Sequence, residues 1–258
     1  MMKKSNLPKK LLGIHVDDIT LSEFLTTIKK TVSTGQKKIF ANVNVNAINI
    51  AYEQGWYRDF FNQCDIVFCD GYGVKLAAAL CGFTIRERIT SADMMWRLAE
   101  FSEKKEITLF FLGSKPGVAE KAAAQLQARN PRLQILGCYH GFFEKSPASD
   151  ENRTVISMIN ACKPDVLILG MGMPMQERWL VDNWDGINAH VALTGGAVFD
   201  YVSGELKRAP RWMTDHGLEW LGRLFIEPRR LWKRYIIGNP LFFWRVFIHE
   251  ILRKPLPK

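Results

Sequence analysis

Short apolar runs alternate along this chain with segments whose apolar residues recur at the spacing of a helix. The apolar runs predict buried strands at residues 38–41, 66–69, 107–112, 133–137, 165–169 and 189–194. The segments between them predict helices at residues 47–61, 75–80, 118–129, 152–162 and 176–183, and a further helix from Ser91 or Asp93 to Phe101. Such alternation is typical of a mainly parallel sheet flanked by helices, so the predicted fold class is α/β and Rossmann-like.

Polar or glycine-rich turns follow most of these predicted strands. The turns are Asn42-Val43-Asn44, Asp70-Gly71, Gly113-Ser114-Lys115-Pro116-Gly117, Gly170-Met171-Gly172-Met173-Pro174 and Thr194-Gly195-Gly196. In open parallel sheets, ligands bind in the crevice beyond the carboxyl ends of the strands, and glycines let the backbone approach a ligand closely. The pattern therefore predicts a binding cleft to which these turns contribute.

Asp70 is the first candidate for chemistry. It follows an apolar strand and precedes Gly71-Tyr72-Gly73, so its carboxylate can face the cleft and take a proton from an attacking hydroxyl. A helix N-cap is an equal alternative, because aspartate is common at that position.

The other turns also have a functional and a structural interpretation. Asn42 and Asn44 point the same way if the chain is extended, and they either bind sugar hydroxyls or form a turn. The turn from Gly113 to Gly117 leads into a helix whose first N–H groups suit an anion, or it is a plain strand-to-helix connection. Of Arg86 and Arg88, one is expected to face a ligand anion and the other the solvent.

The end of the chain differs in charge and aromatic content. From Glu205 onward there are twelve Lys and Arg against five Asp and Glu, which is +7 of the formal net charge of +9. The interleaved residues are Arg223, Arg229, Arg230 and Arg234 beside Trp212, Trp220, Trp232 and Trp244. Arginine suits phosphate oxygens and tryptophan suits the boundary between water and lipid, so the tail predicts a diphosphate-handling enzyme at a membrane surface. A solvated basic face over aromatic core positions is the alternative.

The predicted division is a catalytic core at residues 1–204 and a basic helical appendage at residues 205–258. Residues 235–252 are the longest largely apolar stretch, but Asn239-Pro240, Arg245, His249 and Glu250 interrupt it. A membrane span needs about 20 mainly apolar residues, so a helix lying in the interface is predicted. Met1-Met2-Lys3-Lys4 lacks the apolar region of a secretory signal.

The cysteines and histidines predict neither disulfides nor a metal site. The five cysteines show no CxxC spacing, which favours reduced thiols in a cytoplasmic protein. The five histidines are scattered, with no HxxxH or DxD arrangement. No metal and no cofactor are therefore expected.

Taken together, these segments resemble the WecG/TagA/CpsF family of bacterial glycosyltransferases, including its GumM-like exopolysaccharide members. The matching stretches are Phe40-Ala41-Asn42-Val43-Asn44, Asp70-Gly71-Tyr72-Gly73, Leu112-Gly113-Ser114-Lys115-Pro116-Gly117, Gly172-Met173-Pro174-Met175-Gln176-Glu177-Arg178-Trp179, Phe199-Asp200-Tyr201, Lys207-Arg208-Ala209-Pro210 and Gly217-Leu218-Glu219-Trp220. Their order and spacing along residues 38–235 are more specific than any single stretch.

The resemblance implies an inverting, metal-independent transfer of a sugar from a UDP-sugar to a polyprenyl-diphosphate-linked saccharide. It implies a protein held peripherally on the cytoplasmic face of the membrane, at an anionic lipid surface. Glucose, N-acetylmannosamine and its uronic acid are the candidate sugars, and Arg178-Trp179 with residues 208–212 favours glucose. The acceptor and the oligomeric state, including a homo-oligomer, stay open.

The resemblance also implies roles for individual residues. The family's base maps to Asp70, and its Thr-x-Asn pair maps to Asn42 and Asn44, with asparagine in place of threonine. Its arginine maps to Arg88 and its PxQE glutamine to Gln176, which completes the predicted catalytic group. The nucleotide and its phosphates are expected at Gly113, Ser114, Lys115, Gly117, Gly172, Gly195, Gly196, Asp200, Arg208, Arg211, Arg223, Arg229 and Arg230. Arginines there would stabilise the negative charge that develops on departing UDP.

Two other classes of protein compete with this interpretation. A nucleotide-cofactor oxidoreductase needs a GxGxxG turn with an acidic residue about 20 positions later, and the chain has no such turn. A nucleic-acid-binding module would use the basic tail and bind with a steep salt dependence. The interleaved aromatic residues and the glycine turns favour the glycosyltransferase, with no nucleic-acid partner.

Overall fold

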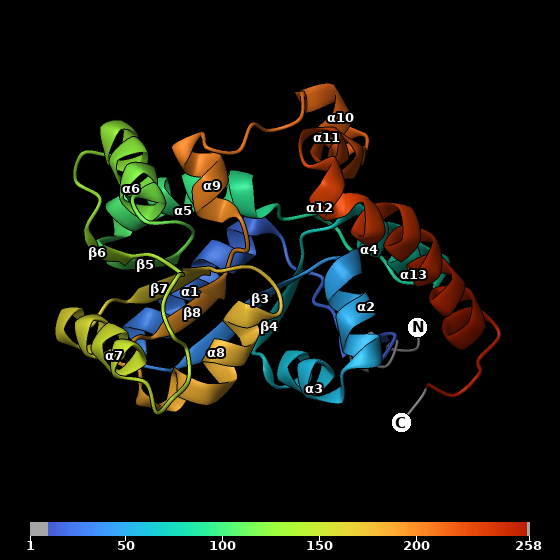
Figure 1. The fold of residues 1–258 in the computed structure, drawn as a ribbon, viewed down its shortest axis with the longest axis horizontal. Coiled ribbons are helices and arrows are strands. Elements are labelled where there is room, and N and C mark those ends of the chain that lie inside the picture. Colours follow the sequence, from blue (N-terminus) through green and yellow to red (C-terminus); the bar gives the residue numbers. More distant parts are fainter. Residues whose placement is uncertain (1–9, 257–258) are drawn as a thin grey trace, which may run out of the picture.

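The computed structural model describes residues 10–256, and Figure 1 shows its fold. The sequence prediction made on Met1-Met2-Lys3-Lys4 lies outside the described residues. At the centre is a six-stranded parallel sheet with the order β4-β3-β8-β7-β5-β6. The strands are β3 (Lys38–Val43), β4 (Ile66–Cys69), β5 (Leu109–Gly113), β6 (Ile135–Tyr139), β7 (Val166–Gly170) and β8 (Val191–Thr194). The predicted α/β fold with a mainly parallel sheet is confirmed.

Helices cover both faces of this sheet. The helices of the core are α1 (Leu21–Ser33), α2 (Val45–Glu53), α3 (Gly55–Gln63), α4 (Tyr72–Leu80), α5 (Ser91–Lys105), α6 (Val118–Arg129), α7 (Asp150–Cys162), α8 (Met175–Asn183), the short η1 (Trp184–Gly186) and α9 (Val198–Ser203). Residues of α2, α3, α4, α7 and α8 pack into one apolar cluster, and residues of α1, α5, α6 and α9 pack into another. Neighbouring strand residues alternate between the clusters, as Phe110 and Phe111 do, because strand side chains point to opposite faces.

The structure corrects the prediction at two places. Residues 47–61 form two helices, because Gln54 is extended (φ −125°, ψ 105°) and Gly55, a poor helix former, begins α3. Helix α1 was not predicted, although Thr20 and Glu23 form a capping box at its start. A small antiparallel pair, β1 (Lys10–Leu11) and β2 (Ile14–His15), precedes it.

The tail folds back across the core (Figure 1). It contains α10 (Arg211–Asp215), α11 (Glu219–Ile226) and then one continuous helical run made of α12 (Pro228–Trp232), the π-helix η2 (Lys233–Ile237), α13 (Gly238–Val246) and the π-helix η3 (Phe247–Ile251). Helix α13 packs on α2 and α4, and Arg245 forms an ion pair with Glu53 at 2.6 Å. Among residues 10–256, no helix combines the length and the apolar character that crossing a membrane requires. The domain boundary after residue 204 stays a prediction.

Candidate active site

A cleft of about 450 Å³ opens beyond the carboxyl ends of β3, β4, β7 and β8. The core lines one side of the cleft and the tail lines the other. Core residues on it include Asn42, Asn44, Asp70, Arg88, Thr90, Ser91, Gly172, Gly195, Gly196 and Tyr201, and tail residues include Glu219, Trp220, Arg223, Arg230, Arg234 and Tyr235. Nine residues of the predicted site therefore meet in one cleft.

Asp70 lies directly after β4 and is partly exposed to this cleft. Its Oδ2 accepts a hydrogen bond from Nδ2 of Asn42 at 3.1 Å. Its Oδ1 accepts one from the backbone N–H of Ser91 at 3.3 Å, and the Ser91 hydroxyl donates to Oδ2 at 3.4 Å. The N-cap of the following helix α4 is Gly71, which has no side-chain cap. The alternative interpretation of Asp70 as the N-cap of that helix is therefore wrong.

Thr194, the last residue of β8, orients the Asn42 carboxamide. Its hydroxyl donates to Oδ1 of Asn42 at 2.7 Å and accepts from the backbone N–H of Asn42 at 2.9 Å. Because Oδ1 is occupied, the amide nitrogen of Asn42 faces Asp70. Thr194 and Asn42 are almost completely buried, at 0% and 2% exposed, so water does not compete for these bonds.

The surroundings of Asp70 raise its pKa above the usual value for a carboxyl group. Burial is the largest cause, and the negative charge of Glu219 adds to it. Hydrogen bonding from Asn42, the positive charge of Arg88 and the Ser91 N–H act in the opposite direction. A carboxylate with a raised pKa is a stronger base, which suits proton abstraction.

Arg88 and Arg86 have different roles. Arg88 lines the cleft and reaches the tail, where it contacts Glu219 at 3.0 Å and the carbonyl of Thr214 at 3.0 Å. Arg86 lies on the surface between Asp18 and Glu23. Of the two arginines, Arg88 therefore lies on the cleft and Arg86 does not.

The tail arginines differ in what they contact. Arg223 and Arg230 share the carboxylate of Glu227, at 3.4 Å for Arg223 and 2.8 Å from Nε of Arg230. Arg234 has no acidic partner within ion-pair distance among the described residues, and its buried Nε lacks a hydrogen-bond partner. Burial lowers the pKa of Arg234. This arginine is the cation of the cleft best placed to gain from an anionic ligand.

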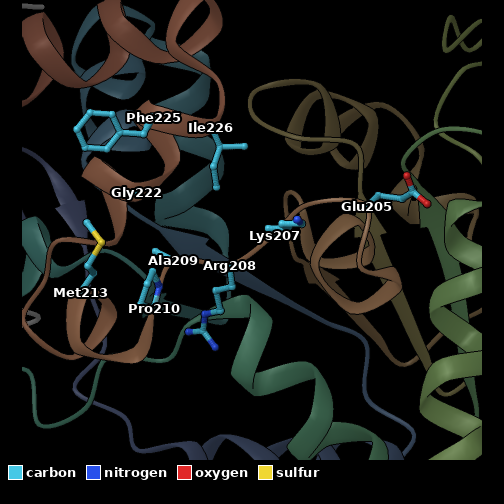
Figure 2. Close-up of a pocket in the computed structure, with 9 residues that line it drawn as sticks. All are labelled: Glu205, Lys207, Arg208, Ala209, Pro210, Met213, Gly222, Phe225 and Ile226. Carbon is cyan, nitrogen blue, oxygen red and sulfur yellow. The ribbon is translucent and has the colours of Figure 1, made fainter.

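Three predicted phosphate-binding arginines lie outside the cleft lining. Arg208 pairs with Asp93 and donates to the Thr90 hydroxyl at 3.2 Å, so it fastens the tail to α5. Arg211 and Arg229 are exposed. Arg208 lines a second cavity of about 540 Å³ together with Ala209, Met213 and Phe225 (Figure 2).

The glycine turn after β8 lines the cleft, but its N–H groups are already used. The N–H of Gly195 donates to the Leu169 carbonyl at 2.8 Å, and the N–H of Gly196 donates to Oε1 of Gln176 at 3.2 Å. These glycines therefore shape the cleft wall instead of offering amides to a phosphate. Gly172, with φ of +82°, lines the cleft beside them.

The predicted glycine turn after β5 is not part of the cleft lining. Gly113 packs against the backbone of Gly170, where a Cβ atom would lie 2.3 Å from the carbonyl carbon. The Ser114 hydroxyl donates to Asp200 Oδ2 at 2.9 Å, and Lys115 and Gly117 are exposed. The Ser114–Asp200 bond connects this turn to α9, which favours the structural interpretation of the turn.

Gln176 and Asn44 are held by local hydrogen bonds. Gln176 is completely buried behind the Gly195–Gly196 turn, whereas Asn44 lines the cleft. Asn44 also caps α2, because its Oδ1 accepts from the N–H of Ala47 at 3.1 Å. Both interpretations of Asn44 are therefore compatible with its position.

Sequence reasoning did not select several residues of the cleft as site residues. They are Glu219, Arg234, Tyr201, Trp220 and Tyr235. Thr194, which lies behind the cleft lining and orients Asn42, was also not selected. Glu219 and Trp220 belong to a recognised motif, which was an available signal. The burial of Arg234 and the bond between Thr194 and Asn42 depend on contacts between distant segments. Among residues 10–256, no three His, Cys, Asp or Glu side chains gather as a metal ion would need.

Comparisons with known proteins identify the family of this chain. Residues 9–255 match the Glycosyl transferase WecG/TagA/CpsF family. The match extends along nearly the whole chain, so the protein belongs to this family and is a glycosyltransferase.

Curated relatives in Staphylococcus aureus strains MRSA252, NCTC 8325 / PS 47 and COL are each 26% identical over 247 residues, covering 95% of this chain and 94% of the relative. Each is named N-acetylglucosaminyldiphosphoundecaprenol N-acetyl-beta-D-mannosaminyltransferase.

Proposed function

We propose that this protein transfers a sugar from a UDP-sugar to a saccharide linked to a polyprenyl diphosphate, with inversion at the anomeric carbon and without a metal ion. The observation that carries the proposal is the position of Asp70, a carboxylate with a raised pKa in a cleft that also contains several arginines. The names of the relatives support N-acetylmannosamine as the donor sugar and an N-acetylglucosaminyl diphospholipid as the acceptor.

Asp70 acts as the general base in this proposal. It takes the proton from the acceptor hydroxyl while the hydroxyl oxygen forms a bond to the anomeric carbon. The bond from that carbon to the β-phosphate oxygen of UDP breaks on the opposite side, so the configuration inverts. Asn42 keeps the Asp70 carboxylate in place through its amide nitrogen.

Arginines stabilise the leaving group. As the glycosidic bond breaks, negative charge grows on the β-phosphate, and fixed cations near that oxygen lower the barrier. Arg234 is the first choice because it lacks an acidic partner among the described residues, and Arg223, Arg230 and Arg88 line the same cleft. The arginine fork matches phosphate oxygens in geometry as well as in charge.

The helical run from residue 228 to 251 is proposed to dock on a membrane surface. It exposes Trp232, Ile236, Trp244, Phe247 and Ile251, each between 43% and 60% accessible and spaced mostly by three or four residues or their multiples. Residues at these spacings share one helix face. Exposed Arg229, Lys233, Arg253 and Lys254 add positive charge, which anionic lipids on the cytoplasmic leaflet attract.

A UDP-release assay tests the proposed reaction. The donor panel is UDP-N-acetylmannosamine, its uronic acid and UDP-glucose, each with a short-chain lipid diphosphate that carries N-acetylglucosamine. We expect that UDP is released only when the acceptor is present, and that a chelator does not change the rate of release. Acceptor-independent release, or a rate abolished by chelator and restored by Mg²⁺, contradicts the proposal. Independence from nucleic acid and a homo-oligomeric state stay predictions.

A further inference from the structure

A buried carboxyl group lies behind the floor of the cleft. Gln176 and Glu177 begin α8, and both side chains are 0% exposed. The Gln176 amide nitrogen donates to Oε1 of Glu177 at 2.8 Å. Since Oε1 of Gln176 accepts a hydrogen bond from the N–H of Gly196 at 3.2 Å, the Gln176 carboxamide connects Glu177 to the glycine turn that lines the cleft.

The glycine turn needs such support because its backbone is unusual. Gly196 has φ of +59°, in the left-handed region. A Cβ atom on Gly195 would lie 2.6 Å from a methyl group of Val198. The N–H of Gly196 donates its hydrogen bond to Oε1 of Gln176. The orientation of this carboxamide therefore affects the position of this part of the cleft wall.

We propose that Glu177 is a positioning residue: by accepting from the Gln176 amide, it selects the carboxamide orientation that holds the Gly195–Gly196 turn against the cleft. With the carboxyl oxygen in place, the Gln176 nitrogen points to Glu177 and its oxygen points to Gly196. Without this oxygen, the Gln176 carboxamide could rotate by half a turn. Its NH₂ group would then face the N–H of Gly196, so that two donors would oppose each other. The inference rests on the proposed function only in treating the cleft as the donor site.

The surroundings of Glu177 keep this carboxyl group neutral. Burial raises the pKa of Glu177 to about 8. Three groups oppose this rise: the Gln176 amide, the backbone N–H of Glu177 and the nearby Tyr57 hydroxyl. The charge of Glu177 raises the pKa of the Tyr57 hydroxyl and of the Cys64 thiol, and the charge of Arg234 lowers the pKa of Tyr57. Neither the Tyr57 hydroxyl nor Oε2 of Glu177 has a hydrogen bond of ordinary geometry. An ionised Glu177 would therefore be a poorly compensated buried charge.

Hydrogen exchange at the Gly196 amide tests the proposal without an enzyme assay. The variants are Glu177→Gln, which resembles the neutral acid, and Glu177→Leu, which removes the acceptor. The matched control is Asn183→Leu on the same helix, which removes buried bonds to Asn152 and to the Trp179 carbonyl. Unfolding temperatures are measured for all variants.

Glu177→Leu is expected to speed exchange at Gly196 by about tenfold, as the loss of one net hydrogen bond implies. Glu177→Gln should stay within about twofold of the wild type, and Asn183→Leu should lower the unfolding temperature without speeding exchange at Gly196. Equal exchange in Glu177→Leu and Asn183→Leu, or loss of protection in Glu177→Gln, overturns the proposal.

A pH series keeps the proposal testable if Glu177→Leu does not fold. After correction for intrinsic exchange, the wild-type Gly196 amide is expected to keep its protection between about pH 7 and 9, because the Glu177 carboxylate accepts from the Gln176 amide at least as well as the neutral acid does. A loss of protection in the wild type that Glu177→Gln does not share overturns the inference. UDP affinity separates the two claims: a loosened turn with unchanged UDP affinity contradicts the donor site and leaves the positioning role intact.

Discussion

The guanidinium of Arg88 lies 3.0 Å from the carboxylate of Glu219, with both side chains less than 20% exposed. This ion pair joins the core to the tail inside the cleft. It also places the negative charge of Glu219 near Asp70, whose pKa it helps to raise. The tail thus contributes to the strength of the base as well as to the shape of the cleft.

Replacing Glu219 should change the pH dependence of transfer. Asp70 works as a base only when it is ionised, so activity rises as pH increases through its pKa. Glu219→Gln removes a charge that raises this pKa, so the acidic limb of the kcat/KM profile should move to lower pH. Glu227→Gln, which changes the other carboxylate of the tail near the arginines, is the control. An unmoved limb, or a shift to higher pH, contradicts the electrostatic link.

Thr194 should matter although it does not touch substrate. Thr194→Val keeps the shape but removes the hydroxyl that orients Asn42, leaving a buried amide oxygen unpaired at a cost of about 1–3 kcal/mol in unfolding free energy. We expect kcat to fall about 10- to 100-fold, because a misplaced group slows the reaction. Thr194→Ser retains the hydroxyl and should recover most of the rate. Similar rates in both variants would show that the hydroxyl is dispensable.

Arg234 should contribute to nucleotide binding more than its exposed neighbour Lys233. Arg234→Met removes a partly buried cation, and a charge-assisted hydrogen bond contributes about 1.5–3 kcal/mol. Calorimetry should therefore show UDP binding weakened by roughly 10- to 100-fold. Lys233→Met is the control for general loss of positive charge. Equal effects of the two substitutions would indicate a diffuse electrostatic contribution and no specific contact.

The apolar face of the tail should determine vesicle binding. Trp244→Ser combined with Phe247→Ser removes two large exposed side chains, each able to contribute about 1.5–3 kcal/mol when buried. Co-sedimentation with vesicles that contain anionic lipid should decrease by at least about tenfold. The control pair is Phe142→Ser with Val181→Ser, two exposed apolar residues of the core. Unchanged sedimentation of the tail variant would remove the docking role.

Much of the fold was accessible from the sequence because buried parallel strands are short apolar runs. All six strands of the large sheet were predicted to within a few residues. The strand order was not, because β8 inserts between β3 and β7, and no local pattern encodes that pairing. The single helix predicted at residues 47–61 failed because one extended residue, Gln54, breaks it.

The candidate site was accessible only in part. Asn42 lies near the end of β3, and Asn44 and Asp70 directly follow β3 and its neighbour β4, so the parallel sheet brings them together. The family resemblance implied that Arg208 contacts phosphate, but the sequence does not show which acidic residue an arginine pairs with, and here Asp93 is that residue. The position of Arg234, a cleft arginine without an acidic partner among the described residues, depends on how the tail packs. Local sequence therefore identified the core half of the cleft better than the tail half.

The transfer rate of Asp70→Asn tests the central claim most directly. The substitution keeps the size of the side chain but removes the base, so transfer should fall by about 10²- to 10⁴-fold, while UDP-sugar binding measured by calorimetry stays within a few fold of the wild type. Near-wild-type turnover with bound donor would contradict the assignment of Asp70 as the base.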